Sequence, residues 1–267
     1  LDKIDGINAV LFICQLGTAG GTAVADTLSG KVSPSGKLAS TWAMKYSDIP
    51  FSDEFSYLNG NLEDEYYKEG IYVGYRYFDS FGVEPCYPFG YGLSYTDFSL
   101  IGSEVRVEGT KVNIEVIVTN VGANYSGKEV AQVYVSAPAG KLDKEYQSLA
   151  AFAKTRILRP AESEVLTMSF DMTEIASYDE AKASYVLDAG EYIVRLGNSS
   201  RNTVPVAVLT LDEVVVVSEH CNVCPMVEKF DELKSEAREK EKINLSVPRV
   251  VVKAADFKTV KYTYKTP

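Results

Sequence analysis

The sequence predicts a mainly β fold: a β-sandwich that is preceded by a partial α/β segment and followed by a helical tail. Three observations support this prediction. Short strand-like runs of alternating apolar residues fill residues 98–217. An apolar run, a glycine-rich turn and a short helical pattern open the chain. After residue 217 the composition becomes rich in Glu and Lys, with apolar residues at helical spacing.

The composition narrows the class of partner. The 267 residues leave room for two domains, and 46% hydrophobic with 24% charged residues is typical of globular chains. A net charge of −10 and a pI near 4.8 argue against nucleic acid and against anionic membrane surfaces. No window has the length and apolarity of a transmembrane helix. The charge fits a neutral substrate or plain solubility, and we expect no nucleic acid and no membrane partner.

The N-terminal residues predict one parallel α/β unit. Residues 8–14 are an apolar run that predicts a fully buried strand. The glycine-rich residues 17–21 connect this strand to a helix over residues 22–29, with Gly30 as its C-cap.

Residues 31–42 are predicted to turn at residues 34–36 and then to continue as a second strand. Because parallel strands are buried on both faces, a single α/β unit cannot cover its own sheet. We therefore expect residues 1–60 to be the terminal part of a larger α/β-sandwich domain.

The central region carries the strand pattern of a sandwich. Alternating apolar residues mark strands around residues 112–118, 131–135 and 166–170. Residues 188–190 separate two further runs, 184–187 and 191–196, as the turn of a hairpin would. About seven short strands without a long helix predict a fibronectin III-like, or immunoglobulin-like, β-sandwich over residues 98–217.

The tail, residues 218–267, differs in composition. Met226, Phe230, Leu233 and Ala237 follow helical spacing and predict an amphipathic helix over residues 225–242. Two strand-like runs follow, at residues 247–253 and 257–264. They either lie on the sandwich or connect to a further domain.

A linker rich in glycine and tyrosine, residues 61–97, joins the two predicted domains. Its two dense stretches are residues 69–79 and 87–96. Glycines there permit backbone conformations that a Cβ would forbid, and the tyrosines supply flat faces with a polar tip.

Three blocks in this order resemble glycoside hydrolase family 3, the family of β-glucosidases and β-xylosidases. Residues 20–38 are similar to the end of its α/β domain, and the two linker stretches are similar to its interdomain segment. The sandwich contributes motifs at residues 118–122, 127–134, 189–192 and 197–200. Two positions depart from the family. Thr18-Ala19 stands where a polar Gln-Glu pair is common, and residues 160–163 replace a proline-glycine turn.

The resemblance implies retaining hydrolysis of a β-glycoside, which needs two carboxylates about 5–5.5 Å apart. The family's nucleophile is an Asp that precedes a tryptophan on a (β/α)8 barrel, but Ser40-Thr41 precede Trp42, the one tryptophan here. The barrel's Lys-His motif is absent too, since His220 follows Glu219. We therefore expect both catalytic carboxylates outside this chain and name no catalytic residue in it.

The implied partners are the barrel and the remainder of the α/β domain, with a β-linked oligosaccharide or glucoside as the substrate of the whole enzyme. Some members of the family have a permuted domain order, which stays open here, as does a homo-oligomer.

Four linker residues are the candidates for a place near the sugar: Glu69, Tyr72, Tyr75 and Arg76. Arg76 can bind a carboxylate or hydroxyls through its planar fork, and a tyrosine can stack on a pyranose face. The structural alternative, which we prefer for Arg76, is an ion pair with an acidic neighbour at the domain junction.

Cysteines and the single histidine do not predict a metal or a cofactor. His220, Cys221 and Cys224 lie close together, but structural zinc needs four ligands and no second pair completes the set. Cys14 and Cys86 are expected to be small core residues. The loop at residues 17–21 lacks the spacing of a nucleotide-binding motif.

Two other classes of function stay open: a module that binds carbohydrate or protein, and a purely structural sandwich. Four cysteines in a chain of this length are not a disulfide framework, and no signal peptide is visible. Both observations favour the cytoplasm, although the compartment stays open.

Overall fold

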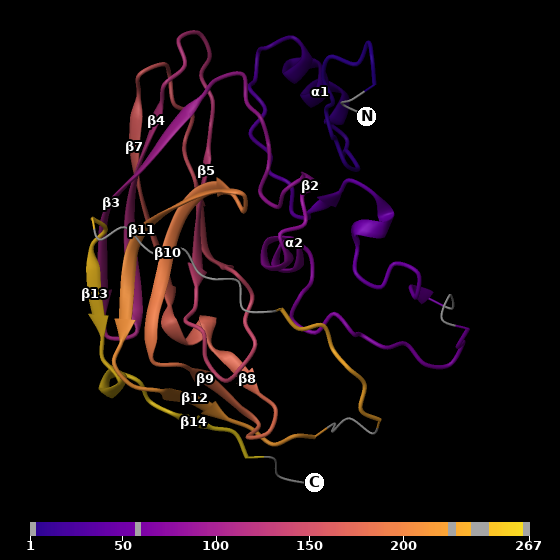
Figure 1. The fold of residues 1–267 in the computed structure, drawn as a ribbon. Coiled ribbons are helices and arrows are strands. Elements are labelled where there is room, and N and C mark those ends of the chain that lie inside the picture. Colours follow the sequence, from indigo (N-terminus) through magenta and orange to yellow (C-terminus); the bar gives the residue numbers. More distant parts are fainter. Residues whose placement is uncertain (1–3, 57–59, 224–227, 236–245, 264–267) are drawn as a thin grey trace.

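The structure is a computed structural model that describes residues 4–56, 60–223, 228–235 and 246–263. A β-sandwich forms the main body, and the N-terminal segment and the linker lie along one side of it (Figure 1). The predicted mainly β fold with a fibronectin III-like sandwich is confirmed. The described residues contain two α-helices, α1 (Gly20–Leu28) and α2 (Tyr75–Phe81). Neither helix is long and apolar enough to cross a membrane.

Two sheets make the sandwich. The larger sheet has the order β13-β11-β10-β5-β6, and the smaller has the order β3-β4-β7. The strands of the larger sheet are β5 (Val130–Ser136), β6 (Ser148–Lys154), β10 (Gly190–Ser199), β11 (Asn202–Leu211) and β13 (Arg249–Val252). Those of the smaller sheet are β3 (Phe98–Glu108), β4 (Lys111–Asn120) and β7 (Ser163–Asp171).

The core lies between these sheets and follows the predicted alternation. Val112, Ile114, Val116 and Val118 on β4 are fully buried. Strand β5 differs because nearly all of its residues are buried. Its Ala131, Val133 and Val135 belong to the core, whereas Gln132 and Tyr134 alternate with them and contact the linker. The outer face of β5 is therefore covered by the linker rather than by water.

A third sheet shows that one predicted hairpin is wrong. This sheet has the order β14-β12-β9-β8. Its strands are β8 (Ser177–Asp179), β9 (Ser184–Leu187), β12 (Val215–Glu219) and β14 (Val260–Lys261). Strand β9 pairs with β8 and β12, whereas β10 pairs with β5 and β11. The turn at residues 188–190 thus passes the chain between sheets, because alternation sets which face is buried but not which strand is the partner.

The N-terminal segment also differs from its prediction. Residues 8–14 form no strand, and Leu11, Phe12 and Ile13 are each more than 40% exposed. No described strand pairs with this run, so its backbone has no ladder to join. Cys14 is exposed as well and is not a core residue, whereas Cys86 is half-buried.

Helix α1 begins two residues before the predicted start, and Ser29 is its C-cap. Within residues 31–42 only Trp42 belongs to a strand, β1 (Trp42–Ala43), which pairs with β2 (Pro85–Tyr87) of the linker. Short 3₁₀ helices occur at Tyr46–Asp48, Met172–Ile175 and Ala254–Asp256.

The tail folds back onto the molecule. Of the predicted helix at residues 225–242, residues 228–235 form no helix, so the prediction is wrong there, and the remainder lies outside the described residues. Tertiary contact overrides the helical spacing, since the Leu233 amide donates to the Lys68 carbonyl at 2.7 Å. Strands β13 and β14 pair in parallel with β11 and β12. The first strand-like run therefore lies on the sandwich, as one alternative predicted, whereas the second run adds a short strand to the third sheet.

Candidate functional site at the junction of linker and sandwich

Helix α2 positions two of the predicted site residues. It begins after Gly74 (φ +58°) and ends at Gly82 (φ +67°), both in the left-handed region that favours glycine. These two glycines limit the helix to seven residues. The helix thus turns Tyr75 and Arg76 towards the sandwich.

Tyr75 is held by strand β6 and by neighbouring rings. Its hydroxyl oxygen accepts a 2.9 Å hydrogen bond from the Leu149 amide. Its ring centroid lies 4.9 Å from that of Phe89 and 5.9 Å from that of Tyr134. The ring is therefore packed into the junction.

Arg76 lies at the rim of the same junction. Its Nε is 3.5 Å from Oε1 of Glu145, and its Nη2 donates to the Ser148 hydroxyl at 3.4 Å. The side chain is 44% exposed. This is an ion pair with an acidic neighbour, while proximity of Arg76 to a sugar stays a prediction.

Tyr72 of the linker is fully buried, and it contacts the tail. Its hydroxyl donates to the Ser235 hydroxyl at 2.9 Å, and its ring lies 5.0 Å from that of Phe81. Burial raises the pKa of Tyr72 to about 12. A sugar can reach this ring only if the tail moves away.

Glu69 is half-buried and lines a cavity of about 310 Å³ between the linker and residues 46–55. Of the four predicted site residues, only Glu69 lines this cavity. The structure thus brings Tyr75 and Arg76 together against β6, and it places Tyr72 and Glu69 elsewhere on the linker.

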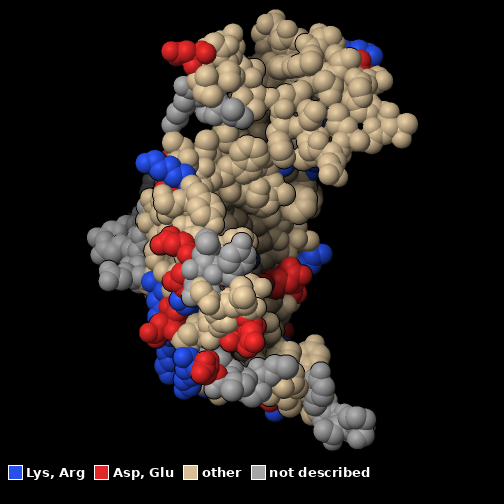
Figure 2. Space-filling view, turned by 90° about the vertical axis from the view of Figure 1, so that its right-hand side faces the viewer, with Lys and Arg blue, Asp and Glu red and all other residues tan. Residues whose placement is uncertain are grey.

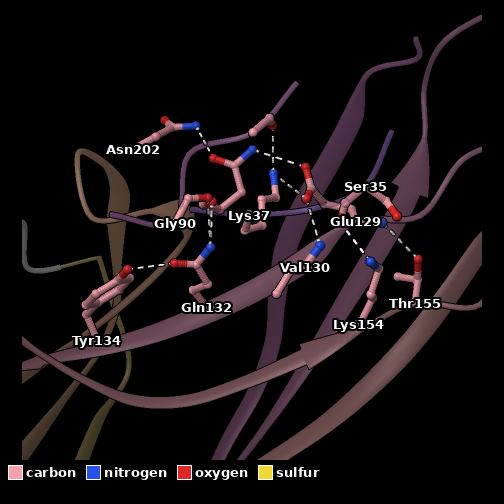
Figure 3. Close-up of polar contacts among 12 residues, drawn as sticks. Ser35, Lys37, Gly90, Glu129, Val130, Gln132, Tyr134, Lys154, Thr155 and Asn202 are labelled. Carbon is pink, nitrogen blue, oxygen red and sulfur yellow. Dashed lines mark hydrogen bonds and ion pairs between the residues drawn. The ribbon is translucent and has the colours of Figure 1, made fainter. Parts of the chain in front are cut away.

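A buried ion pair, which the sequence reasoning missed, joins the N-terminal segment to the sandwich (Figure 3). Lys37 Nζ lies 2.8 Å from Glu129 Oε1, and the two side chains are 12% and 7% exposed. Lys37 also donates to the Gly92 carbonyl at 3.0 Å, and Asn198 donates to Glu129 Oε2 at 3.2 Å. Lys37 and Glu129 lie in two of the blocks that resemble family 3, and this was the only signal available for them.

Gln132 extends this network across the outer face of β5 (Figure 3). Its amide nitrogen donates to the carbonyls of Asn198 at 2.6 Å and of Gly90 at 3.3 Å. Its amide oxygen accepts from the Tyr134 hydroxyl at 2.6 Å. Burial raises the pKa of Tyr134, so this hydroxyl keeps the proton that it donates even at alkaline pH.

A second buried pair connects α2 to the sandwich. Arg201 Nε lies 2.7 Å from Asp79 Oδ1, and Gln147 donates to Asp79 Oδ2 at 3.0 Å. Burial raises the pKa of Asp79, whereas Gln147 and Arg201 act in the opposite direction. Arg201 also donates to the carbonyls of Phe78 and Val83, and so it caps the C-terminal end of α2.

The histidine and cysteine residues do not form a metal site among the described residues, which hold no suitable group of three His, Cys, Asp or Glu side chains. The His220 ring stacks on Tyr262 at 4.7 Å, and its Nε2 lies 2.8 Å from the Ser218 hydroxyl. Cys221 is exposed, and Cys224 lies outside the described residues.

Comparison with known proteins shows to which family the chain belongs. The model of the glycosyl hydrolase family 3 C-terminal domain matches residues 2–75, and that of the fibronectin type III-like domain matches residues 129–200. β-Glucosidase A of Butyrivibrio fibrisolvens is 42% identical over 225 residues, which are 75% of this chain and 26% of that protein. A β-glucosidase of Ruminococcus albus is 40% identical over 79% of this chain and 22% of its own length.

Solved structures give the same result. A β-glucosidase from Paenibacillus barengoltzii matches with a TM-score of 0.72 and 45% identity over 76% of this chain and 23% of that chain. β-Glucosidase 3B from Thermotoga neapolitana, in complex with glucose, matches with a TM-score of 0.69 and 44% identity over 74% of this chain and 27% of that chain.

The fold and the junction therefore define the C-terminal region of a glycosidase-like protein. The chain belongs to glycoside hydrolase family 3, and within it corresponds to the C-terminal part of β-glucosidase-like proteins. It spans 22–26% of the length of the two relatives named above.

Proposed function

We propose that this chain is the non-catalytic portion of a retaining β-glycosidase that hydrolyses terminal β-linked glucosides. Both catalytic carboxylates then lie on polypeptide outside the chain. The observation that carries this proposal is the extent of the similarity: three quarters of the chain matches β-glucosidases at 40–45% identity, but only about a quarter of each of them is matched.

The carboxylates at the junction form ion pairs within the chain, which supports a structural rather than a catalytic role for this chain. Glu129 is paired with Lys37, and Asp79 is paired with Arg201. A general acid or a nucleophile must reach the substrate, whereas these two side chains are almost completely buried against cations of this chain.

The surface of the N-terminal segment supports a place for the remainder of the α/β domain. Val10, Leu11, Phe12 and Ile13 are 41–57% exposed. Figure 2 shows few charged side chains over the upper part of this side of the molecule, and more of them towards the lower part. A run of consecutive exposed apolar side chains is typical of an interaction surface. We propose that the rest of the α/β domain covers it.

The domain boundaries are part of the proposal: an α/β segment over residues 1–60, a linker over 61–97, a fibronectin III-like domain over 98–217 and a tail over 218–267. Strand β13 pairs with β11, and β14 pairs with β12. Both pairings support close association of the tail with the fibronectin III-like domain. Limited proteolysis tests these boundaries, and cleavage confined to the sandwich interior would contradict them.

A chromogenic assay tests the function. Hydrolysis of p-nitrophenyl β-D-glucopyranoside is measured for the purified 267-residue chain and for the full protein of the parent gene. We expect turnover by the full protein alone. Turnover by the chain, absent from a mock purification of the same host, would contradict the proposal.

A further inference from the structure

The cavity lined by Glu69 is formed by two segments that are adjacent in space. Its walls are residues 46–55, which follow β1, and residues 65–69 of the linker. Its volume of about 310 Å³ lies at the lower end of small-molecule sites. A cavity of this size suits one sugar ring rather than an extended chain.

Aromatic rings form part of the lining. Tyr46, Phe51, Phe55 and Tyr66 all line the cavity, and Phe55 and Tyr46 are 68% and 60% exposed. Such rings present a flat apolar face, which matches the C–H face of a pyranose. The face of the Phe51 ring is already occupied by the Lys68 ammonium, which lies 5.6 Å from the ring centroid. Phe55 is the most exposed of these rings, and we therefore assign it to the ligand.

Carboxylates form the polar part of the lining. Glu54 is neutralised by an ion pair with Lys68. Glu65 and Glu69 line the cavity as well, and no ion pair joins either of them to another described residue. An ionised carboxylate accepts charge-assisted hydrogen bonds from hydroxyl groups. Glu65 and Glu69 are thus acceptors beside an exposed ring.

The tail holds the linker wall of this cavity in place. The Leu233 amide donates to the Lys68 carbonyl at 2.7 Å, and the Phe230 ring packs edge-on against Tyr66 at 5.5 Å. Because a site that is ordered before binding loses less entropy on binding, this contact favours a preformed pocket.

We propose that this cavity binds one neutral pyranose ring, either a free monosaccharide or the end of a glycoside. Glu65 and Glu69 accept hydrogen bonds from its hydroxyls, and Phe55 stacks on its C–H face. The choice of a sugar over an organic ammonium ion rests on the proposed function, while the cavity and its lining do not depend on it.

Saturation-transfer NMR with the complete 267-residue chain tests the proposal, with glucose and methyl β-D-glucopyranoside as probes. We expect saturable binding in the millimolar range. Glu69→Gln removes a charged acceptor and is expected to weaken binding about tenfold. Phe55→Ala removes the stacking ring and is expected to weaken it to a similar extent. Glu63→Gln, on an exposed carboxylate outside the cavity, is the matched control and should bind as the unchanged chain does.

Three results would overturn the proposal: no saturable binding of either sugar, equal binding by the Glu69→Gln and Phe55→Ala variants with unchanged melting temperatures, or binding of tetramethylammonium in place of sugar. The assay of hydrolysis by the parent protein is independent of these measurements. A failure of sugar binding can therefore be distinguished from a failure of the proposed function.

Discussion

The ammonium group of Lys37 lies 2.8 Å from the carboxylate of Glu129, and this almost fully buried pair joins the N-terminal segment to the residue that precedes strand β5. The Gly92 carbonyl completes the site by accepting a hydrogen bond from Lys37. The Lys37 ammonium group, which belongs to the α/β segment, thus contacts both the linker and the sandwich.

Breaking this pair on one side is expected to be costly. Lys37→Met leaves the Glu129 carboxylate buried without a cation, and we expect a loss of about 3–5 kcal/mol in the free energy of unfolding. The double variant Lys37→Met/Glu129→Gln removes the unpaired charge and should recover a large part of that loss. Urea denaturation of the single and double variants measures the coupling. Strictly additive effects would show that the two groups do not interact.

The linker approaches the N-terminal segment closely at Gly92. A Cβ at Gly92 would lie 2.1 Å from the Gly36 carbonyl oxygen, which belongs to the backbone and cannot rotate away. We expect Gly92→Ala to lower the free energy of unfolding by about 1–3 kcal/mol through this overlap. Gly36→Ala is the matched control, because a Cβ there meets nothing within 4 Å. Equal melting temperatures for the two variants would contradict the close approach.

The sequence predicted local features of the fold better than partners in space. Alternating residues such as Val112 and Val116 mark a buried face, and this face is found in the core. The same alternation cannot identify which strand lies alongside, so the hairpin between β9 and β10 was wrong. The helical spacing of Phe230 and Leu233 was overridden because these residues contact the linker.

The candidate site shows the same limit. Tyr75 and Arg76 were selected for their chemical type, and the short helix that carries them follows from the flanking glycines. Lys37 and Glu129 were missed because a pair so far apart in sequence leaves no local pattern. The hydrogen bond from Tyr72 to Ser235 of the tail could not be predicted either, because no motif connects these two residues.

Arg76→Ala tests whether this residue supports structure or specificity. The ion pair with Glu145 is partly exposed, so we expect a loss of about 0.2–1 kcal/mol in stability. In the full protein we expect the melting temperature to fall while kcat/KM for a β-glucoside changes little. Thermal melts and steady-state kinetics measure both. A normal melting temperature with a collapsed kcat/KM would assign Arg76 to the substrate instead.

The contact between Tyr72 and Ser235 predicts how alkaline pH acts on the tail. Tyr72→Phe removes the 2.9 Å hydrogen bond and should cost about 0.5–1.5 kcal/mol at neutral pH. Burial raises the pKa of Tyr72 from 10.0 to about 12, so the folded state keeps its proton where the unfolded state has lost it. The stability due to this hydroxyl is therefore fully present below pH 10 and is lost as the pH rises through about 12.

Denaturation of the unchanged chain and of Tyr72→Phe across this pH range measures the effect. The stability difference between the two proteins should be constant below pH 10 and should shrink towards pH 12, because phenylalanine has no proton to lose. Tyr67→Phe is the matched control on the same linker, since the Tyr67 side chain is 78% exposed. A pH-independent difference for Tyr72→Phe, or the same pH dependence for Tyr67→Phe, would mean that the buried hydroxyl does not link the tail to the linker.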